Sequence, residues 1–554
     1  MHDKTPVLIC GAGPVGLTTS ILLSRLGIQN LLIEKRGSVS TLPRARGVMS
    51  RSVEIWARFG LYDELTRVSL PPHWCSEFVY CDTLAGDLIG RMPSNCMAPN
   101  AQARNTAYDF RCTAQDHIDS MLLRHAQTYR EAEIRFSNEL TGYRQEDDVV
   151  VVNVRSADGS DQEIRAQWLV AADGGKSPLR EMAGIGCTGP AAIRTFVNNH
   201  FSADLSRWTG GREGTLMWIL APGLIGCFQP LDGKQRWMCQ FALEPGADSL
   251  ETWTPERVVR RLRDMINDPA AEDVQFQLHS TYTYTVAATV ANRLRDGRLL
   301  LVGDAAHRIP PAGGFGMNTG IQTAHNLAWK LASVIRGEAS DVLLDTFDTE
   351  RREVARRACE FGRINVGYLR AIEVAPTREE KRSAIAASKQ FGNWAGLDLG
   401  VHYEGPGAFV PDDVPIPAVD DSVIEFVPHA KPGHRAPHIW VRQGDVRRSA
   451  VDLFERNIVL LTGAEGSAWI DAARRISERS ALEILAFRVA IDGDLVPEGD
   501  FCKLYGIAPN GAVLVRPDGH VAFRSNAGVD DPDAEVNRAI GEVLRRSNVQ
   551  ENAK

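Results

Sequence analysis

The feature that most constrains this chain is a G-x-G-x-x-G pattern close to its start, formed by Gly11, Gly13 and Gly16. A short apolar run, 7–9, precedes the pattern, and a segment with helical apolar spacing, 17–26, follows it. A second apolar run, 31–33, ends at Glu34. This order is typical of a β-α-β unit that binds a dinucleotide. The glycines form a tight turn, let a phosphate approach the backbone and let helix and strand pack closely. The acid at the end of the second strand accepts a hydrogen bond from a ribose hydroxyl group.

Two later acids also stand where an apolar run ends. Asp173 follows the run 168–172, and Asp304 follows the run 299–302 and one glycine. A loop rich in proline and glycine comes after Asp304 and leads into a predicted helix at 316–336, which Gly337 is expected to end. Each of these two segments, taken alone, is equally compatible with a structural turn.

Together, the three segments resemble the class A flavoprotein aromatic hydroxylases, the para-hydroxybenzoate hydroxylase superfamily. The motifs occur in the order and spacing of that family, and the resemblance covers at least residues 1–400. The segments 403–405, 432–438 and 513–519 look like the phenol-type branch, and most like 2,4-dichlorophenol 6-monooxygenase-like proteins. Members of that branch carry a thioredoxin-like third domain. Cys502 is the one cysteine in this part of the sequence and forms no C-x-x-C pair, so a thiol-redox role is not expected.

The predicted fold class is therefore α/β, with a Rossmann-like FAD-binding domain, an inserted, mostly antiparallel substrate domain and a C-terminal thioredoxin-like domain. The alternating apolar and polar pattern from about residue 190 to 280 predicts the antiparallel sheet. The expected boundaries are 1–189 with 280–400 for the discontinuous FAD-binding domain, 190–279 for the substrate sheet, 401–440 for a wrapping linker and 441–554 for the last domain.

The resemblance implies a role in FAD binding for residues in the first part of the chain. Gly11, Gly13 and Gly16 would hold the pyrophosphate, and Glu34, with Lys35 beside it, would hold the adenosine ribose. Arg44 matches an arginine near the FAD phosphates or the flavin edge. Gln115 matches a glutamine at the start of a helix that touches the ribityl chain or a phosphate.

The later motifs supply the remaining expected FAD contacts. Asp173 would lie near the pyrophosphates of FAD and NAD(P)H, and Asp304 would bind the ribityl chain. Gly316, Met317 and Asn318 sit where backbone N–H groups reach the flavin pyrimidine edge. A helix N-terminus there would stabilise the negative charge of the reduced flavin.

Three residues are the candidates on the substrate side. Tyr284 lies on a predicted strand, 280–286, where the phenol-type branch brings a tyrosine to the substrate hydroxyl, and Tyr282 shares its face. Both tyrosines could equally be ordinary sheet aromatics. Arg46 stands near the place of an acid in that branch, and either a second contact to an FAD phosphate or a substrate contact is open to it. Pro311, in the loop after Asp304, is the third candidate.

The implied activity is that of a monooxygenase with non-covalent FAD and with NADPH or NADH as a transient co-substrate. In this family NAD(P)H reduces FAD, O2 forms a flavin C4a-hydroperoxide, and a ring carbon of a phenolic or related aromatic or heteroaromatic substrate attacks it. The alternatives are an FAD oxidase or dehydrogenase without hydroxylation and a non-catalytic flavoprotein that binds an aromatic ligand. A halogenase is disfavoured, because no two of the 11 tryptophans show the W-x-W spacing.

Composition and charge limit the kinds of binding partner and the location that are expected. The net charge is −8, from 62 basic and 70 acidic residues, with no long basic run, so no nucleic-acid partner is expected. No apolar run is long enough to cross a membrane. Ten scattered cysteines without a C-x-x-C pair predict reduced thiols, a cytoplasmic location and no metal site. A homo-oligomer, dimer or larger, is expected. A phenol, a hydroxylated pyridine and a polyketide-derived ring remain open as substrates.

Overall fold

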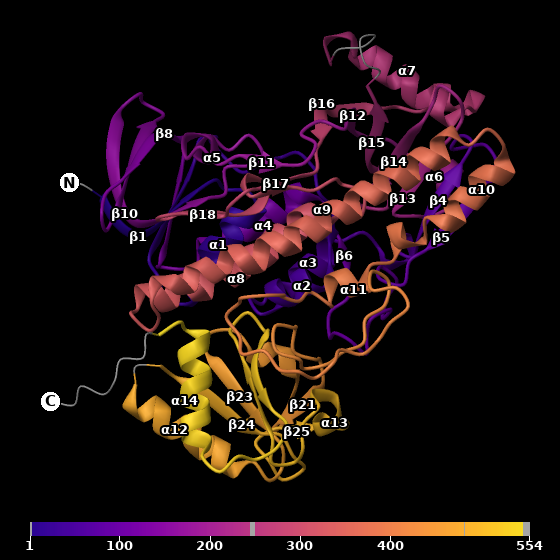
Figure 1. Cartoon of the computed structure of the whole chain (residues 1–554). Coiled ribbons are helices and arrows are strands. Elements are labelled where there is room, and N and C mark those ends of the chain that lie inside the picture. Colours follow the sequence, from indigo (N-terminus) through magenta and orange to yellow (C-terminus); the bar gives the residue numbers. More distant parts are fainter. Residues whose placement is uncertain (1–2, 244–249, 481, 547–554) are drawn as a thin grey trace.

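The computed structural model describes residues 3–243, 250–480 and 482–546 of the 554-residue chain. Two sheets lie side by side, and a C-terminal unit packs beneath them (Figure 1). The long helix α9 extends from the first sheet to the second, since Phe347 belongs to the core of the first and Ile372 to the core of the second. The mixed α/β architecture that the sequence predicts is confirmed.

Parallel strands form the centre of the first sheet. In spatial order they are β19 (Leu299–Leu301), β10 (Asp161–Ala171), β1 (Asp3–Cys10), β2 (Asn30–Glu34) and β7 (Ala132–Phe136). Their apolar runs are continuous because the central residues of these strands are buried on both faces. The sheet continues through antiparallel pairs at β8 (Asn138–Gln145), β9 (Val150–Ser156) and β18 (Arg295–Asp296). β9 and β10 form an antiparallel pair.

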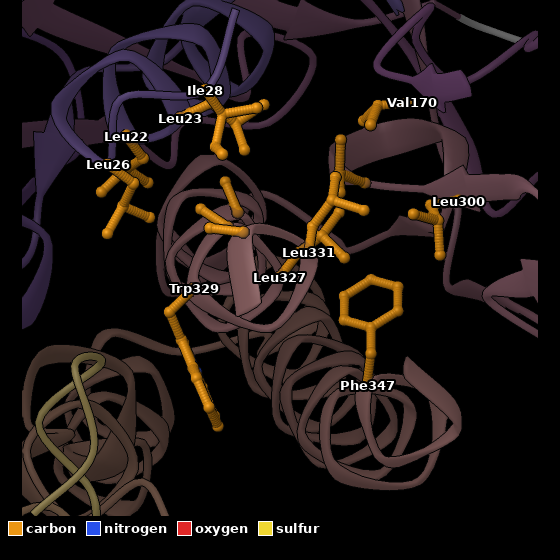
Figure 2. Packing of buried hydrophobic residues seen from close by; sticks show 14 of the residues in the cluster. Leu22, Leu23, Leu26, Ile28, Val170, Leu300, Leu327, Trp329, Leu331 and Phe347 are labelled. Atoms are coloured by element: carbon orange, nitrogen blue, oxygen red, sulfur yellow. The ribbon is translucent and has the colours of Figure 1, made fainter. Parts of the chain in front are cut away.

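Two helices bury this sheet. Figure 2 shows Leu22 and Leu23 of α1 (Pro14–Arg25) facing Leu327 and Leu331 of α8 (Phe315–Ile335), with Val170 of β10 nearby. All five side chains are almost fully buried. The α8 helix ends as predicted, with Gly337 in the left-handed conformation. This packing fixes the N-termini of α1 and α8 at the carboxyl edge of the parallel strands.

The second sheet has seven strands, and all but one of its pairs are antiparallel. In spatial order they are β16 (Gln277–Val286), β12 (Arg194–Ser202), β15 (Arg236–Ala242), β14 (Gly226–Pro230), β13 (Leu216–Ile219), β4 (Glu77–Cys81) and β5 (Leu88–Pro93). The sheet thus takes two strands from before residue 100, outside the expected range 190–279, and its strand β16 starts inside that range and extends to Val286. Parallel pairing with β4 covers the edge of β13, which would otherwise be left open.

The outer face of this second sheet is covered by α7 (Pro255–Ile266), at the top of Figure 1. Val258, Leu262 and Met265 of this helix are buried, and Cys239 of β15 has its sulfur 3.9 Å from that of Met265. The inner face is therefore the one turned toward the first sheet.

The remaining elements connect these layers. The helices are α2 (Ser50–Ala57), α3 (Tyr62–Val68), α4 (Gln115–Ala126), α5 (Pro178–Met182), α6 (Ser206–Thr209), α9 (Asp345–Val374), α10 (Arg378–Ala387) and α11 (Ala395–Asp398). The short strands are β3 (Gly47–Val48), β6 (Arg111–Cys112), β11 (Cys187–Thr188), β17 (Thr289–Ala291) and β20 (His307–Arg308).

The C-terminal unit has thioredoxin-like topology. Its sheet has the order β24 (Ile484–Arg488), β23 (Ile458–Thr462), β26 (Ala512–Val515) and β27 (Val521–Ser525), with only β23 and β24 parallel. The helices α12 (Ser467–Arg479) and α14 (Pro532–Val543) pack on this sheet. A smaller sheet, β21 (Trp440–Gln443), β22 (Val446–Ser449) and β25 (Val496–Pro497), adjoins it. Cys502, in α13 (Phe501–Tyr505), is a free thiol, as are the other nine cysteines.

A buried ionic network joins this unit to the two long helices. Glu350 of α9 accepts hydrogen bonds from Asn326 (2.7 Å), Lys330 (2.7 Å), the backbone of Ala408 (2.7 Å) and both terminal nitrogens of Arg516 (2.8 and 3.0 Å). The side chains of Glu350, Lys330 and Arg516 are no more than 1% exposed. Each charge in this cluster therefore depends on a partner from another element.

Among the described residues, no helix is both long enough and apolar enough to cross a membrane. The same part of the chain contains no cluster of three or more histidine, cysteine or acidic side chains arranged to bind a metal ion.

Candidate active site

The glycine turn between β1 and α1 has the geometry that a dinucleotide site requires. Gly11 has φ +114°, and a Cβ there would lie 2.3 Å from the carbonyl oxygen of Ala172. A Cβ on Gly16 would lie 2.0 Å from the carbonyl oxygen of Gly11. A Cβ on Gly13, by contrast, would meet nothing within 4 Å. Packing therefore excludes a side chain at Gly11 and Gly16. Gly13 leaves open space at the N-terminus of α1, where a phosphate group binds favourably.

Glu34 lies at the end of β2 and turns toward this loop. Its Oε2 accepts a hydrogen bond from the backbone N–H of Ala12 at 2.9 Å, and its Oε1 accepts from the backbone and side chain of Arg36 at 3.0 and 2.8 Å. Burial opposes the charged form, but these donors lower the pKa of Glu34. The carboxylate is therefore ionised and lies next to the glycine turn. Its remaining lone pairs can accept hydrogen bonds from ribose hydroxyl groups. Lys35 is exposed.

Replacing Glu34 by alanine is expected to weaken FAD binding ten- to hundredfold. The carboxylate would lose a charge-assisted hydrogen bond to the ribose, typically worth ~1.5–3 kcal/mol. The affinity is measured by titrating the flavin-free protein with FAD and following flavin fluorescence. Glu133→Ala serves as the control, because Glu133 is an exposed glutamate on the neighbouring strand β7. An FAD affinity equal to wild type in the Glu34 variant would remove Glu34 from the ribose site.

Asp304 faces an interior space. Its side chain is exposed, yet burial raises the pKa of its carboxyl group, against the opposing charges of Arg308 and Arg44. A group that is both accessible and surrounded by protein lines a space inside the fold. No hydrogen-bond donor or cation among the described residues contacts its carboxylate at bonding distance. Asp304 is thus available to hydroxyl groups such as those of a ribityl chain.

Asp173 and Gln115 border the same region. Asp173 accepts a hydrogen bond from the backbone of Leu179 at 3.2 Å, while its Oδ1 is buried without a partner in the described chain. Burial raises the pKa of Asp173. Gln115 accepts from the backbone of Ala45 at 3.2 Å and donates to Asp119 at 3.3 Å. These contacts place Gln115 beside the segment that carries Arg44.

Asp119 is a further acidic residue at this region that the sequence analysis did not select. This aspartate of α4 is fully buried, and burial raises its pKa to about 7, opposed by its bond to Gln115 and by the charges of Arg36 and Arg44. Its Oδ1 has no partner among the described residues. The position four residues after Gln115 in a helix was the available signal, because such residues share a face.

The loop before α8 presents a helix N-terminus to the same space. Gly313 and Gly314 have φ of +114° and +77°, and Pro311 is exposed. The side chain of Asn318 accepts from the backbone of Met49 at 2.9 Å and donates to the carbonyl oxygens of Gly47 at 2.9 Å and Gly314 at 2.7 Å.

These bonds hold the first turn of α8 against β3. The side chain of Asn318 is thus used within the protein, while the first N–H groups of the helix, around Gly316 and Met317, have no partner inside the helix. Gly316 and Met317 are both half-buried.

Arg46 differs from both roles expected for it. Its side chain is 8% exposed and donates to the carbonyl oxygens of Pro230 at 2.8 Å and Thr215 at 3.1 Å, and to the sulfur of Cys112 at 3.7 Å. The guanidinium group is therefore held by the strand ends of the seven-stranded sheet. In this structure Arg46 is a contact between the two sheets, and its placement supports neither an FAD-phosphate contact nor a substrate contact.

Tyr282 and Tyr284 share the inner face of the seven-stranded sheet, as predicted. The hydroxyl group of Tyr284 donates to Oε1 of Gln240 at 3.3 Å, and its ring stacks on Phe196 with centroids 5.6 Å apart. The hydroxyl group of Tyr282 lies 3.8 Å from the sulfur of Met238. Gln240 could not be found from the sequence, because β15 lies 40 residues before the tyrosines.

Two histidines, His307 and His434, lie in packed surroundings. His307 is fully buried without a hydrogen-bond partner in the described chain, and burial lowers its pKa to about 3. His434 stacks on His402 with ring centroids 4.6 Å apart. Neither is placed for proton transfer at the site.

These residues fit FAD. The glycine turn and Glu34 suit the adenosine and pyrophosphate half of the cofactor, whose phosphates need open space at a helix N-terminus. Asp173 and Asp119 each keep a buried carboxylate oxygen without a partner among the residues that the structure describes, and Asp304 is accessible in an enclosed position. The flavin end would lie against the start of α8.

Two protein families match this chain. The family described as "FAD binding domain" matches residues 4–362, and the family described as "Aromatic-ring hydroxylase, C-terminal" matches residues 429–546. Together they cover both sheets and the thioredoxin-like unit.

Similar proteins of known name extend over the whole chain. A 4-methyl-5-nitrocatechol 5-monooxygenase of Burkholderia sp. is 33% identical, covering 98% of each chain. An aklavinone 12-hydroxylase of Streptomyces purpurascens is 33% identical, covering 99% of each chain. A 2,4-dichlorophenol 6-monooxygenase of Delftia acidovorans is 29% identical, covering 98% of each chain.

Solved structures agree with these relatives. A flavin-dependent monooxygenase in complex with FAD and substrate superposes with a TM-score of 0.91 at 29% identity, covering 99% of this chain and 100% of that one. An aklavinone-11 hydroxylase with FAD and aklavinone gives 0.85 at 30% identity, with the same coverage. The family, the fold and the cofactor expected from the sequence are confirmed. The chain belongs to the class A flavin-dependent aromatic hydroxylases, and it is an FAD-dependent aromatic monooxygenase that uses NAD(P)H.

Proposed function

We propose that the chain hydroxylates a phenolic ring held between the start of α8 and the inner face of the seven-stranded sheet. Arg44 carries this proposal. Its charge acts on the pKa of Asp304, among the FAD residues, and also on that of Tyr282, on the sheet. One cation close to both groups supports a substrate site that borders the flavin.

FAD, when bound, accepts a hydride from NAD(P)H, reacts with O2 and supplies one oxygen atom to the aromatic ring. Around it, this chain holds charge and excludes water. The N–H groups at the start of α8 would favour the negative charge of a reduced flavin bound against them. Burial raises the pKa of Tyr284 well above its usual value, so its hydroxyl group stays protonated and donates to Gln240.

An aromatic cluster stands beside the start of α8. The rings of Phe315 and Phe361 are 5.3 Å apart, and Trp394 lies 6.4 Å from Phe315 and 6.5 Å from Phe110. All four side chains are buried. Their role in this proposal is to keep water away from the reacting oxygen. Two relatives are named for phenolic substrates, a nitrocatechol and a dichlorophenol, which supports a phenol here.

The test is a screen of phenolic compounds with the FAD-loaded protein, NADPH or NADH, and 18O2. The purified protein should be yellow with dissociable FAD. An accepted phenol should stimulate NAD(P)H oxidation and gain one 18O atom, as measured by mass spectrometry. NAD(P)H oxidation without labelled product would instead indicate an oxidase. Aromatic binding without NAD(P)H oxidation would indicate a non-catalytic binding protein.

The location and assembly of the protein remain predictions. Ten free cysteines suit a reducing compartment, and we infer the cytoplasm. We also expect a dimer or larger homo-oligomer, which light scattering on the purified protein would measure.

A further inference from the structure

The helix α2 lies where the C-terminal unit meets the FAD-binding part of the chain (Figure 1). Arg51 and Glu54 of this helix and Arg58, its C-cap, follow the spacing i, i+3, i+7, so they share one face. Val53 and Trp56 lie on the opposite face and are buried in the core of the first sheet. One face of α2 therefore belongs to that core, and the other is polar.

The three polar residues bind the C-terminal unit and the segment before it. Their partners, in order along the helix, are the backbone carbonyl group of Asp518, the guanidinium group of Arg435 and the backbone carbonyl group of Phe454. Arg51 also donates to Glu54 at 2.8 Å, and neither side chain is more than 3% exposed. These buried contacts fix α2 relative to the C-terminal unit.

The turn between β26 and β27 is shaped to fit against Arg51. Gly519 of this turn has φ +78°, and a Cβ there would lie 3.2 Å from Nη2 of Arg51. The side chain of Asp518, in the same turn, reaches α8, since its Oδ2 accepts a hydrogen bond from Nδ2 of Asn326 at 3.2 Å. Asp518 is 1% exposed. The turn therefore holds α2 and α8 at the same time.

The other end of α2 is tied to the start of α8. Met49, the residue before α2, donates its backbone N–H to Oδ1 of Asn318 at 2.9 Å. The methyl carbon of Met49 also lies 3.7 Å from the place of a Cβ on Gly314, the N-cap of α8. Only two residues separate Met49 from Arg51. The grip of the C-terminal unit on Arg51 is thus passed to the loop and first turn of α8.

Asp518 consequently fixes α8 at two points. One is direct, at Asn326, and the other runs through Arg51 and Met49 to Asn318. The two points are eight residues apart, which is about 12 Å along a helix. A helix that is held at two separated points is fixed in both position and direction. The turn of the C-terminal unit therefore helps to determine where the first N–H groups of α8 lie.

We propose that the C-terminal unit sets the reduction potential of the bound flavin, with Arg51 and Asp518 as positioning residues for the start of α8. This goes beyond the proposed function and rests on it only for the place of the flavin against that helix. The positive end of a helix acts over about one turn, so its effect depends on its exact position. A displaced N-terminus would stabilise the negative reduced flavin less, and affect the neutral oxidised flavin little. Groups that bind a cofactor need such support from their surroundings.

The test measures the two-electron reduction potential of the FAD-loaded protein against a reference dye, without an aromatic substrate. In Arg51→Gln, the affinity for reduced FAD relative to oxidised FAD should fall roughly two- to fivefold, which lowers the potential by about 9–21 mV. Gly519→Ala acts from the other side of the contact, because its methyl group would press on the guanidinium group of Arg51. It should shift the potential in the same direction, and it decides the question if Arg51→Gln does not fold.

Arg58→Gln is the matched control. Arg58 lies on the same face of α2 and also binds the C-terminal unit, but it is nine residues from Met49. This variant should keep the wild-type potential, even where it lowers the melting temperature. An unchanged potential in folded Arg51→Gln, or an equal shift in Arg58→Gln, would overturn the inference. Because the measurement needs no substrate, these outcomes are distinct from a failure of 18O incorporation, which would refute the proposed function alone.

Discussion

Replacing Glu350 by glutamine is expected to lower the free energy of unfolding by about 3–5 kcal/mol, the usual cost of breaking one side of a buried ion pair. Burial alone would raise the pKa of Glu350, but the charges of Arg516 and Lys330 outweigh it and hold the pKa at about 2. Glutamine keeps the shape and removes the charge. Lys330 would then lie fully buried with no anion in contact, and Arg516 would keep only Asp518.

Urea unfolding followed by fluorescence and by circular dichroism measures this effect. The control is Glu353→Gln, one turn further along α9, where the ion pair with Arg356 is largely exposed and worth less than about 1 kcal/mol. Arg516 belongs to the thioredoxin-like unit, so the Glu350 variant should also unfold in two transitions, one for that unit and one for the rest of the chain. Equal midpoints for the two variants would show that the network does not stabilise the interface.

The same network predicts how stability depends on pH. The pKa of Glu350 is about 2 in the folded chain, against an ordinary value of 4.5, so its stabilisation is present above pH 4.5 and lost as the pH falls toward 2. Burial lowers the pKa of His520 from 6.5 to about 4. As the pH falls from 6.5 to 4, the unfolded chain binds a proton at His520 that the folded chain does not, so the free energy of unfolding decreases. The free energy of unfolding of the wild type should therefore decrease on acidification. In Glu350→Gln it should depend less on pH below pH 4.5.

Much of the first sheet could be predicted because strands that are buried on both faces have a simple sequence pattern. The runs at 7–9 and 299–302 are continuous and apolar, since side chains on both faces of these parallel strands are buried. The membership of β4 and β5 in the other sheet could not be predicted. Their pattern says that they are strands, and only the pairing of β4 with β13, over 130 residues away, decides which sheet they join.

The candidate site divides in the same way. The glycine turn and Glu34 form a local pattern, so their geometry follows from the order of residues. Arg46 stands two residues from Arg44, and nothing local says that one guanidinium remains accessible while the other is bound by Pro230 and Thr215. The residues aligned with Tyr282 across the seven-stranded sheet come from five other strands, and their alignment depends on strand register.

Replacing Tyr284 by phenylalanine is expected to lower the rate of hydroxylation by very roughly 10²-fold, the low end for a positioned acid-base group. The Tyr284 hydroxyl group donates to Oε1 of Gln240 and so turns the amide NH2 group toward the place of the substrate oxygen. Without it, that oxygen is no longer held in its more nucleophilic, deprotonated form. FAD binding and reduction by NAD(P)H should stay normal, since the side-chain partners of Tyr284 in the described part of the chain are Gln240 and Phe196. More of the consumed O2 should leave as peroxide.

Three measurements on one preparation decide the role of Tyr284: NAD(P)H consumed, hydroxylated product formed and peroxide released. The matched control is Thr283→Val, which changes the side chain between the two tyrosines on the opposite face of β16. It should keep the product-to-NAD(P)H ratio of wild type, whereas Tyr284→Phe should lower that ratio at an unchanged rate of flavin reduction. If Tyr284→Phe couples as well as wild type, the substrate oxygen is held elsewhere. Tyr282, whose hydroxyl group contacts the sulfur of Met238, is then the next residue to replace.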